Sequence, residues 1–161
     1  MTRLPALGPR GEGWVAIQLA LFAAVGLAGI VTPGTWSGPL GTVGAIAGAL
    51  LVTVGGALAI AGIVGLLRGQ ALTAVPHPRV EARLVDDGVY ALVRHPIYGG
   101  LGLGAAGWAL VRTSWPALLV AVVLLLFLDL KRRREEAWLA ARFPGYGAYR
   151  SRTRRMIPWL W

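Results

Sequence analysis

The sequence contains no cysteine and only two histidines, His77 and His95. The absence of cysteine excludes a disulfide framework, a thiolate nucleophile and a zinc–thiolate site. Two histidines are too few for a metal cluster, so we expect no metal. Charged residues are also scarce, at 14% against 56% hydrophobic residues, which is too few to build the polar surface of a soluble domain. The bilayer is therefore the expected solvent, and the length leaves room for one domain.

Four apolar stretches approach or exceed the roughly 20 residues that a helix needs to cross about 30 Å of hydrocarbon. They are residues 14–31, 40–67, 97–111 and 115–130, separated by turn-forming residues such as Pro33, Gly34 and Pro116. The sequence predicts an all-α polytopic membrane protein with about four transmembrane helices, a cytoplasmic loop and a helical C-terminal cap. The last two stretches are short, so a re-entrant hairpin is the alternative for them.

Basic residues are distributed unevenly among the predicted connections. Fifteen of the sixteen lie before the first stretch, between the second and third, or after the fourth, and only Arg112 falls elsewhere. Short basic segments stay cytoplasmic, so both termini are predicted to be cytoplasmic, in the plasma membrane of a bacterium or archaeon. The net charge of +9 then reflects topology and anionic lipid headgroups, and we expect no nucleic acid partner. A signal peptide is the alternative for residues 14–31, but no small-residue cleavage site follows them.

Polar residues gather immediately before the third stretch, where Arg94 and His95 precede Pro96. Proline suits the first position of a helix, and the unpaired N–H groups of a helix start favour an anion such as a carboxylate. The alternative is an interfacial anchor, with Tyr90 and Tyr98 in the aromatic belt of the membrane.

A second polar cluster follows the fourth stretch, from Lys131 to Glu136. Lys131 with Glu135 and Arg132 with Glu136 are four residues apart, so surface ion pairs on a helix explain them simply. Glu135 is also spaced by four from Leu139, on a face that carries bulky apolar groups. A carboxylate on that face needs a polar partner.

These motifs occur in an order that resembles the isoprenylcysteine carboxyl methyltransferases and the related phospholipid N-methyltransferases. The resemblance covers about residues 84–160 and rests on Gly88-Val89-Tyr90, Arg94-His95-Pro96-Ile97-Tyr98-Gly99-Gly100, Glu135-Glu136-Ala137-Trp138-Leu139, Phe143, Tyr146-Gly147-Ala148-Tyr149, Arg152 and Pro158. It implies a single membrane domain over 1–161, with residues 1–83 as an N-terminal helix pair and loop and residues 84–161 as the cofactor-binding core.

The cofactor implied by the resemblance is S-adenosyl-L-methionine, whose parts call for basic, acidic and aromatic groups. The residues expected to bind it are Tyr90, Arg94, His95, Pro96, Tyr98, Gly99, Gly100, Glu135 and Glu136. The residues expected to act on the acceptor as catalytic groups are Arg152, Lys131 and Arg134. Lys131 departs from the family pattern, which has arginine there, and a lysine is a point charge without the planar fork of arginine.

The resulting expectation is methyl transfer from S-adenosylmethionine to a lipophilic acceptor at the cytoplasmic face, most like isoprenylcysteine carboxyl O-methylation. Phospholipid N-methylation is one alternative, and a non-catalytic membrane subunit that keeps the fold is another. The expected partners are a lipophilic or lipid substrate and the membrane lipids.

Overall fold

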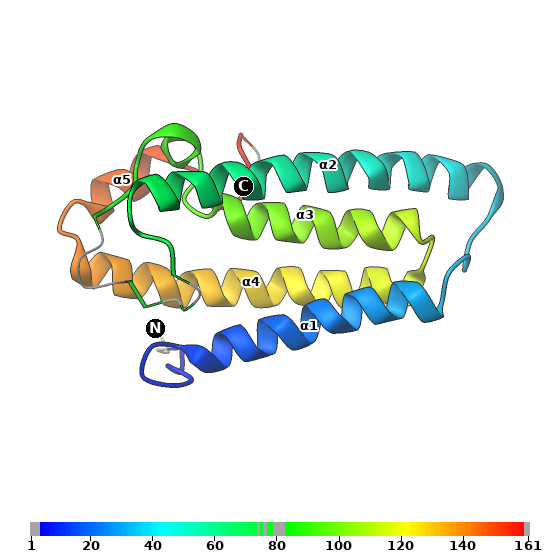
Figure 1. The fold of residues 1–161 in the computed structure, drawn as a ribbon, viewed down its shortest axis with the longest axis horizontal. Helices are drawn as coiled ribbons and strands as arrows, with labels where there is room; N and C mark the ends of the chain where they lie inside the picture. The colour runs from blue at the N-terminus through cyan, green and yellow to red at the C-terminus, as the bar shows by residue number, and fades with distance from the viewer. Residues whose placement is uncertain (1–3, 74, 76, 79–82, 160–161) are drawn as a thin grey trace.

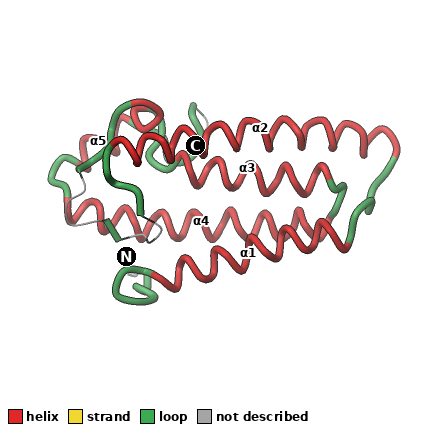
Figure 2. The backbone as a smooth tube through the Cα atoms, viewed as in Figure 1, coloured by secondary structure: helices red, strands yellow, loops and turns green. Residues whose placement is uncertain are grey.

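Four long helices lie side by side in the computed structural model, which describes residues 4–73, 75, 77–78 and 83–159 (Figure 1). The elements are α1 (Glu12–Val31), α2 (Gly38–Arg68), the 3₁₀ helix η1 (Gly88–Ala91), α3 (Pro96–Val111), α4 (Trp115–Arg142) and the short α5 (Tyr146–Arg152). No strand occurs in this part of the chain, and the loops gather at the two ends of the bundle (Figure 2). The prediction of an all-α chain is confirmed.

Proline and small polar residues begin the helices, as the sequence predicts. Pro96 is the first residue of α3, and both α2 and α4 carry proline in their first turn. The Ser114 side chain caps α4 by accepting a hydrogen bond from the backbone N–H of Ala117 at 3.2 Å, which satisfies one of the free donors of a helix start. These signals fix the helix starts within a few residues of where the sequence places them.

Helices α2 and α3 pack closely because glycine recurs every seventh residue on the buried face of α2, at Gly41, Gly48, Gly55 and Gly62. A Cβ atom on Gly55 would lie 2.6 Å from the carbonyl oxygen of Gly100, and one on Gly48 would lie 2.6 Å from that of Gly107. Small residues let membrane helices approach to backbone contact. The glycines therefore set the spacing of this helix pair.

Helix α1 packs mainly on α4, on the opposite side of the bundle from α2 (Figure 1). The Trp14 and Phe127 rings lie 5.5 Å apart at this contact. At the other end of α1, hydrogen bonds join the turn after α1 to the turn after α3. The backbone N–H of Thr35 donates to the carbonyl of Thr113 at 2.8 Å, and the Thr32 and Ser114 hydroxyls lie 2.8 Å apart. Both turns therefore end at the same level of the bundle.

Two helices, α1 and α2, are long and apolar enough to cross a membrane. The 31 residues of α2 extend about 46 Å, whereas the 16 residues of α3 extend about 24 Å, somewhat less than the hydrocarbon core. Helix α4 is apolar only in its first half, and its second half carries the charges from Asp129 onward. The structure therefore supports a membrane protein with two clear spans, and the third and fourth spans stay a prediction.

Candidate functional site

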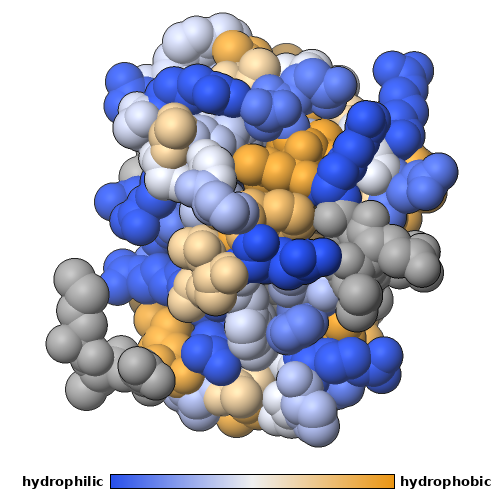
Figure 3. Space-filling view, turned by 90° about the vertical axis from the view of Figure 1, so that its left-hand side faces the viewer, coloured by the Kyte–Doolittle hydropathy of each residue, from blue (hydrophilic) through white to orange (hydrophobic). Residues whose placement is uncertain are grey.

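The polar motifs of the sequence meet at one end of the bundle, where α3 begins and the charged half of α4, η1 and α5 surround it. Hydrophilic side chains dominate this end of the molecule, with an apolar patch between them (Figure 3). The C-terminal segment lies along the start of α3, because the N–H groups of Arg94 and His95 donate to the carbonyls of Arg154 and Arg155, both at 2.9 Å. The N–H of His95 at the helix start is thus bonded to protein.

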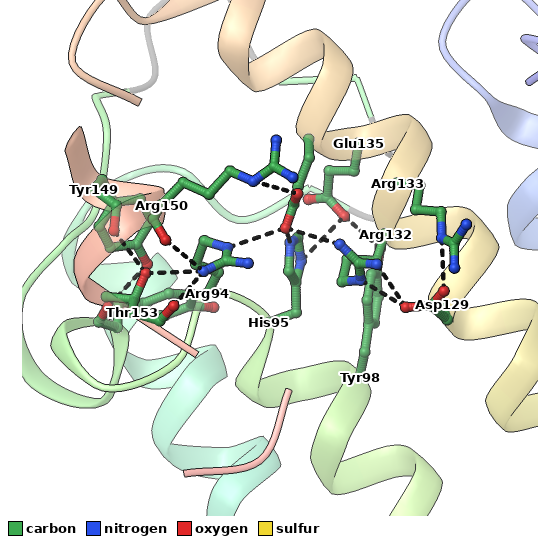
Figure 4. A network of polar contacts seen from close by, with 12 residues as sticks. Arg94, His95, Tyr98, Asp129, Arg132, Arg133, Glu135, Tyr149, Arg150 and Thr153 are labelled. Atoms are coloured by element: carbon green, nitrogen blue, oxygen red, sulfur yellow. Dashed lines mark hydrogen bonds and ion pairs between the residues drawn. The ribbon is translucent and has the colours of Figure 1, made fainter. Parts of the chain in front are cut away.

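Glu136 is the centre of a buried ion-pair network, whose other members Arg94, His95 and Arg132 are labelled in Figure 4. Its Oε1 accepts from Arg94 Nε at 3.0 Å and lies 3.1 Å from Arg132 Nη1 and 3.3 Å from His95 Nε2. Arg150 approaches the other carboxylate oxygen at 3.7 Å. Burial alone would raise the pKa of Glu136, but His95, followed by Arg132 and Arg94, outweighs it and holds that pKa well below its ordinary value. Glu136 is therefore ionised throughout the neutral range.

The network continues along α4 through Arg132. This guanidinium donates to Asp129 Oδ1 through Nε at 2.9 Å and Nη2 at 2.6 Å, and Arg133 donates to Asp129 Oδ2 at 2.7 Å. Arg132 thus connects two carboxylates seven residues apart, and the Arg132–Glu136 pair expected from their spacing is present.

Arg94 holds the C-terminal segment in place. Its Nη1 donates to the backbone carbonyl of Arg150 at 3.0 Å and to the backbone carbonyl and hydroxyl of Thr153, while Nε pairs with Glu136. Arg94 is also a lining residue of the pocket described next. Its bonds to protein groups fix α5 and the chain after it, and its expected contact with the carboxylate of a cofactor stays a prediction.

A pocket of about 380 Å³ opens beside this network, and its α3–α4 wall is polar. The Tyr98 hydroxyl donates to Glu135 Oε2 at 2.7 Å, and the Tyr98 ring stacks on His95 with centroids 5.5 Å apart. Lys131 Nζ lies 5.2 Å from the centroid of the Tyr98 ring and donates to Gln18 Oε1 of α1 at 2.5 Å. The pocket therefore has a cation and a partly exposed carboxylate on one wall.

Another part of the pocket wall is aromatic. It is formed by Tyr90 of η1, by Phe143 at the end of α4, and by Tyr146 and Tyr149 of α5. The Tyr90 hydroxyl donates to the carbonyl of Gly62 at 3.3 Å, and the Tyr149 hydroxyl donates to the carbonyl of Tyr90 at 2.9 Å. Two of these four residues, Tyr146 and Tyr149, thus lie on α5, the helix that Arg94 holds in place.

A second, more open hollow of about 360 Å³ runs along α3 between α1 and α2. It is apolar, with Phe22, Val52, Ala59 and Trp108 among its lining residues, and Leu101 lines both this groove and the pocket. The pocket and this apolar groove are therefore neighbours along α3, and the groove lies between the two helices that are long and apolar enough to cross a membrane.

Several residues that the sequence analysis assigned to the site lie outside the pocket lining. Gly99 and Gly100 approach protein backbone, at Met156 and Gly55, and Gly100 also lines the apolar groove, so their contact with the cofactor stays a prediction. The others that do not line it are Pro96, Glu136, Arg134 and Arg152.

The two arginines among these outliers have partners elsewhere. Arg134 lies over the ring of Trp138 at 4.2 Å, and Arg152 pairs with Asp86 near the surface. Of the three expected catalytic residues, only Lys131 therefore faces the pocket.

Gln18 is a pocket residue that the sequence analysis missed. It is the one polar side chain within the apolar run of residues 14–31, and a polar residue inside a membrane segment is a signal for function. The pocket accordingly draws on residues before position 83 as well as after it.

Comparison with known proteins places this site in a family. The model of the family described as phospholipid methyltransferase matches residues 43–145, well over half of the chain. The chain is 34% identical over 135 residues to the cobalt-zinc-cadmium resistance protein CzcN of Cupriavidus metallidurans, an alignment that covers 79% of this chain and 53% of that protein. It is 38% identical over 77 residues to the protein-S-isoprenylcysteine O-methyltransferase of Schizosaccharomyces pombe, which covers 47% of this chain and 33% of that enzyme.

The chain thus spans about half or less of the length of these two relatives. The matched family region contains both polar motifs of the site, with Arg94 and His95 in the first and Glu135 and Glu136 in the second. The resemblance predicted from these motifs is confirmed. The chain belongs to the phospholipid methyltransferase family.

Proposed function

We propose that this chain is an S-adenosylmethionine-dependent methyltransferase that acts on a lipophilic acceptor at the cytoplasmic face of a membrane. The observation that carries the proposal is that the pocket and the apolar groove adjoin along α3, where Leu101 lines both. A charged donor and the head of a lipid fit the pocket, while the tail of the lipid fits the groove between α1 and α2. A purely water-soluble substrate would leave this apolar groove unoccupied.

The pocket residues fit the chemistry of the methyl donor. S-adenosylmethionine has a zwitterionic amino-acid end, a ribose diol and a planar adenine. His95 and Glu135 supply partners for its carboxylate and ammonium, and the aromatic wall supplies ring faces for its adenine. A volume of about 380 Å³ lies within the usual range for small-molecule pockets.

When bound, S-adenosylmethionine supplies an electrophilic methyl group. An acceptor carboxylate is already ionised at neutral pH, so the protein has to orient it and exclude water more than to move a proton. Lys131 suits this task, because Gln18 fixes its ammonium where α1 meets the pocket. Glu135 then stays available for the donor, since its own bond to Tyr98 uses one oxygen.

Binding and transfer are tested separately. Calorimetry in detergent should show that the protein binds S-adenosylhomocysteine, and Glu135→Gln should weaken this binding by about ten- to a hundredfold, the effect of losing one charge-assisted bond. Glu12→Gln is the matched control, because Glu12 pairs with Arg10 on the surface.

Membranes that contain the protein should transfer label from radioactive S-adenosylmethionine to the lipid phase, in a base-labile form if the product is an ester. A folded protein that binds no S-adenosylhomocysteine would instead be a non-catalytic subunit.

Phospholipid N-methylation is the second candidate, favoured by the aromatic wall and by a potential base. An amine acceptor must lose a proton and gives a methylammonium, which aromatic rings bind well. His95 Nδ1 lies 3.8 Å from Glu135 Oε2 in the pocket wall and offers a route for such a proton. Lipid-phase label that resists base would support this candidate against O-methylation.

We also propose that α3 and α4 cross the membrane with α1 and α2, with both termini in the cytoplasm. Leu119 and Leu126 on α4 are 67% and 63% exposed, much like Leu19 on α1 at 61%. This apolar exposure suits lipid rather than water. The C-terminal end of α2, whose last residue is Arg68, the N-terminal turn and the charged half of α4 all lie at the pocket end (Figure 1), which the positive-inside rule assigns to the cytoplasm.

A further inference from the structure

The chain after α5 turns back along the bundle to the level of the first turns of α3 (Figure 1). Backbone hydrogen bonds hold it there. The N–H of His95 donates to the carbonyl of Arg155 at 2.9 Å, and the N–H of Arg154 donates to the carbonyl of Leu92 at 2.9 Å. The next four residues, 156–159, are apolar and carry no charge. This apolar segment therefore starts from a fixed place in the fold.

Met156 belongs to the apolar core of the bundle. Its side chain is fully buried, in one cluster with Leu124 and Leu128 from the apolar half of α4. Its backbone lies directly against α3, because a Cβ atom on Gly99 would collide with the carbonyl oxygen of Met156. The segment is thus packed against the apolar parts of α3 and α4.

The level of Met156 along the bundle falls within the thickness of a bilayer. Gly99, which Met156 contacts, precedes the end of α3 at Val111 by twelve residues, or about 18 Å of helix. The turn after α3 is bonded to the turn after α1, and α1 is long and apolar enough to cross a membrane. A hydrocarbon core of about 30 Å that begins at these joined turns therefore extends past Met156.

Trp159 ends the described part of this segment and is 83% exposed. The side chains of Arg154 and Arg155, just before the segment, are exposed as well. Arginine side chains bind the anionic headgroups of the cytoplasmic leaflet, and tryptophan is enriched where headgroups meet hydrocarbon. Two cations followed by an apolar segment with an exposed tryptophan therefore suit a segment that enters the membrane from the cytoplasm.

We propose that residues 156–159 re-enter the cytoplasmic leaflet of the bilayer, with Met156 packed into the bundle and Trp159 in contact with lipid. This inference rests on the proposed placement of the bundle in the membrane, and it adds a membrane contact outside the four long helices. His95 lines the pocket and its N–H is bonded to Arg155. The segment therefore connects the lipid surface to the start of α3 at the pocket.

Spin labels on single cysteines test this placement, because the sequence has no cysteine of its own. The labelled variants are Trp159→Cys, Leu27→Cys on the exposed face of α1 and Ser151→Cys on the exposed face of α5, each in vesicles of phosphatidylcholine and phosphatidylglycerol. Oxygen collides mainly with labels in hydrocarbon, and a water-soluble nickel complex collides mainly with labels in water. The ratio of oxygen to nickel collisions should be severalfold higher for Trp159→Cys than for Ser151→Cys, and closer to that of Leu27→Cys.

Two results for Trp159→Cys would overturn the proposal. Nickel collisions as frequent as those of Ser151→Cys would place the segment in water, and few collisions with either reagent would mean that protein, such as a second copy of the chain, covers it. Frequent nickel collisions for Leu27→Cys would instead show that the proposed membrane placement of the bundle fails first. Trp159→Cys and Ser151→Cys replace exposed side chains, so both should melt in detergent at the wild-type temperature.

Discussion

Glu136→Gln should destabilise the protein strongly, because the buried carboxylate compensates the positive charges of neighbouring side chains. The Glu136 side chain is 6% exposed and contacts Arg94, Arg132 and His95. Removing one partner of a buried ion pair costs about 3–5 kcal/mol. Arg132 keeps its bonds to Asp129, and Arg150 is largely exposed to water, so only Arg94 and His95 lose their main compensation. We therefore expect the lower end of this range, about 3 kcal/mol.

Thermal unfolding in detergent measures this loss. For a chain of this size, about 3 kcal/mol lowers the melting temperature by about 6–12 °C. Glu135→Gln is the matched control on the neighbouring residue, since an amide oxygen can still accept the bond from Tyr98. It should change the melting temperature by little while weakening ligand binding. Equal melting temperatures for wild type and Glu136→Gln would refute the structural role that we assign to Glu136.

The same carboxylate predicts a dependence on acid. The pKa of Glu136 in the folded protein lies below its ordinary value of 4.5, so its stabilisation is complete above about pH 4.5 and is lost as the pH falls toward the folded-state pKa. Glu136→Gln lacks this group at every pH. The difference in melting temperature between wild type and variant should thus be constant near neutrality and shrink in acid, and a difference that grew in acid would contradict the assigned sign.

The remaining predictions concern packing, topology and the acceptor. Gly55→Ala should destabilise the protein by about 1–3 kcal/mol through α2–α3 packing, whereas Gly56→Ala, whose added Cβ meets open space, should not. Equal melting temperatures for these two variants would contradict the packing role of Gly55. A cysteine in place of exposed Ser37 should react with an impermeant thiol reagent in intact cells, and one in place of exposed Ser151 only after permeabilisation; the reverse pattern would invert the proposed orientation. Lys131→Gln should slow transfer to the acceptor more than it weakens S-adenosylhomocysteine binding, and a loss confined to that binding would place Lys131 at the donor.

The sequence predicts the helices well because their signals are local. Apolar runs, prolines at the first turn and the Ser114 cap act within a few neighbouring residues, and the structure begins its helices accordingly. The ion pair of Arg132 with Glu136 is local in the same sense. Lys131, which its spacing pairs with Glu135, donates instead to Gln18, 113 residues away in sequence.

The roles of single site residues depend on contacts between distant segments. The Gly99 and Gly100 backbones are approached by Met156 and Gly55, and no local pattern distinguishes such packing from close approach to a ligand. The seven-residue spacing of glycines in α2 was available in the sequence, and it indicates a helix interface. The sequence motifs predict the region of the site, whereas the packing of distant segments determines which of the motif side chains face the pocket.

Glu135 and Glu136 have different roles because successive side chains on a helix point about 100° apart. Glu136 points into the network that holds Arg94, and through Arg94 it fixes α5 and the aromatic wall. Glu135 points into the pocket, where Tyr98 orients it. One glutamate therefore builds the wall on which the adenine is proposed to lie, and the other meets the ligand directly. Because α5 depends on Glu136, loss of this residue should also weaken ligand binding, but only together with a loss of stability, whereas loss of Glu135 should separate the two.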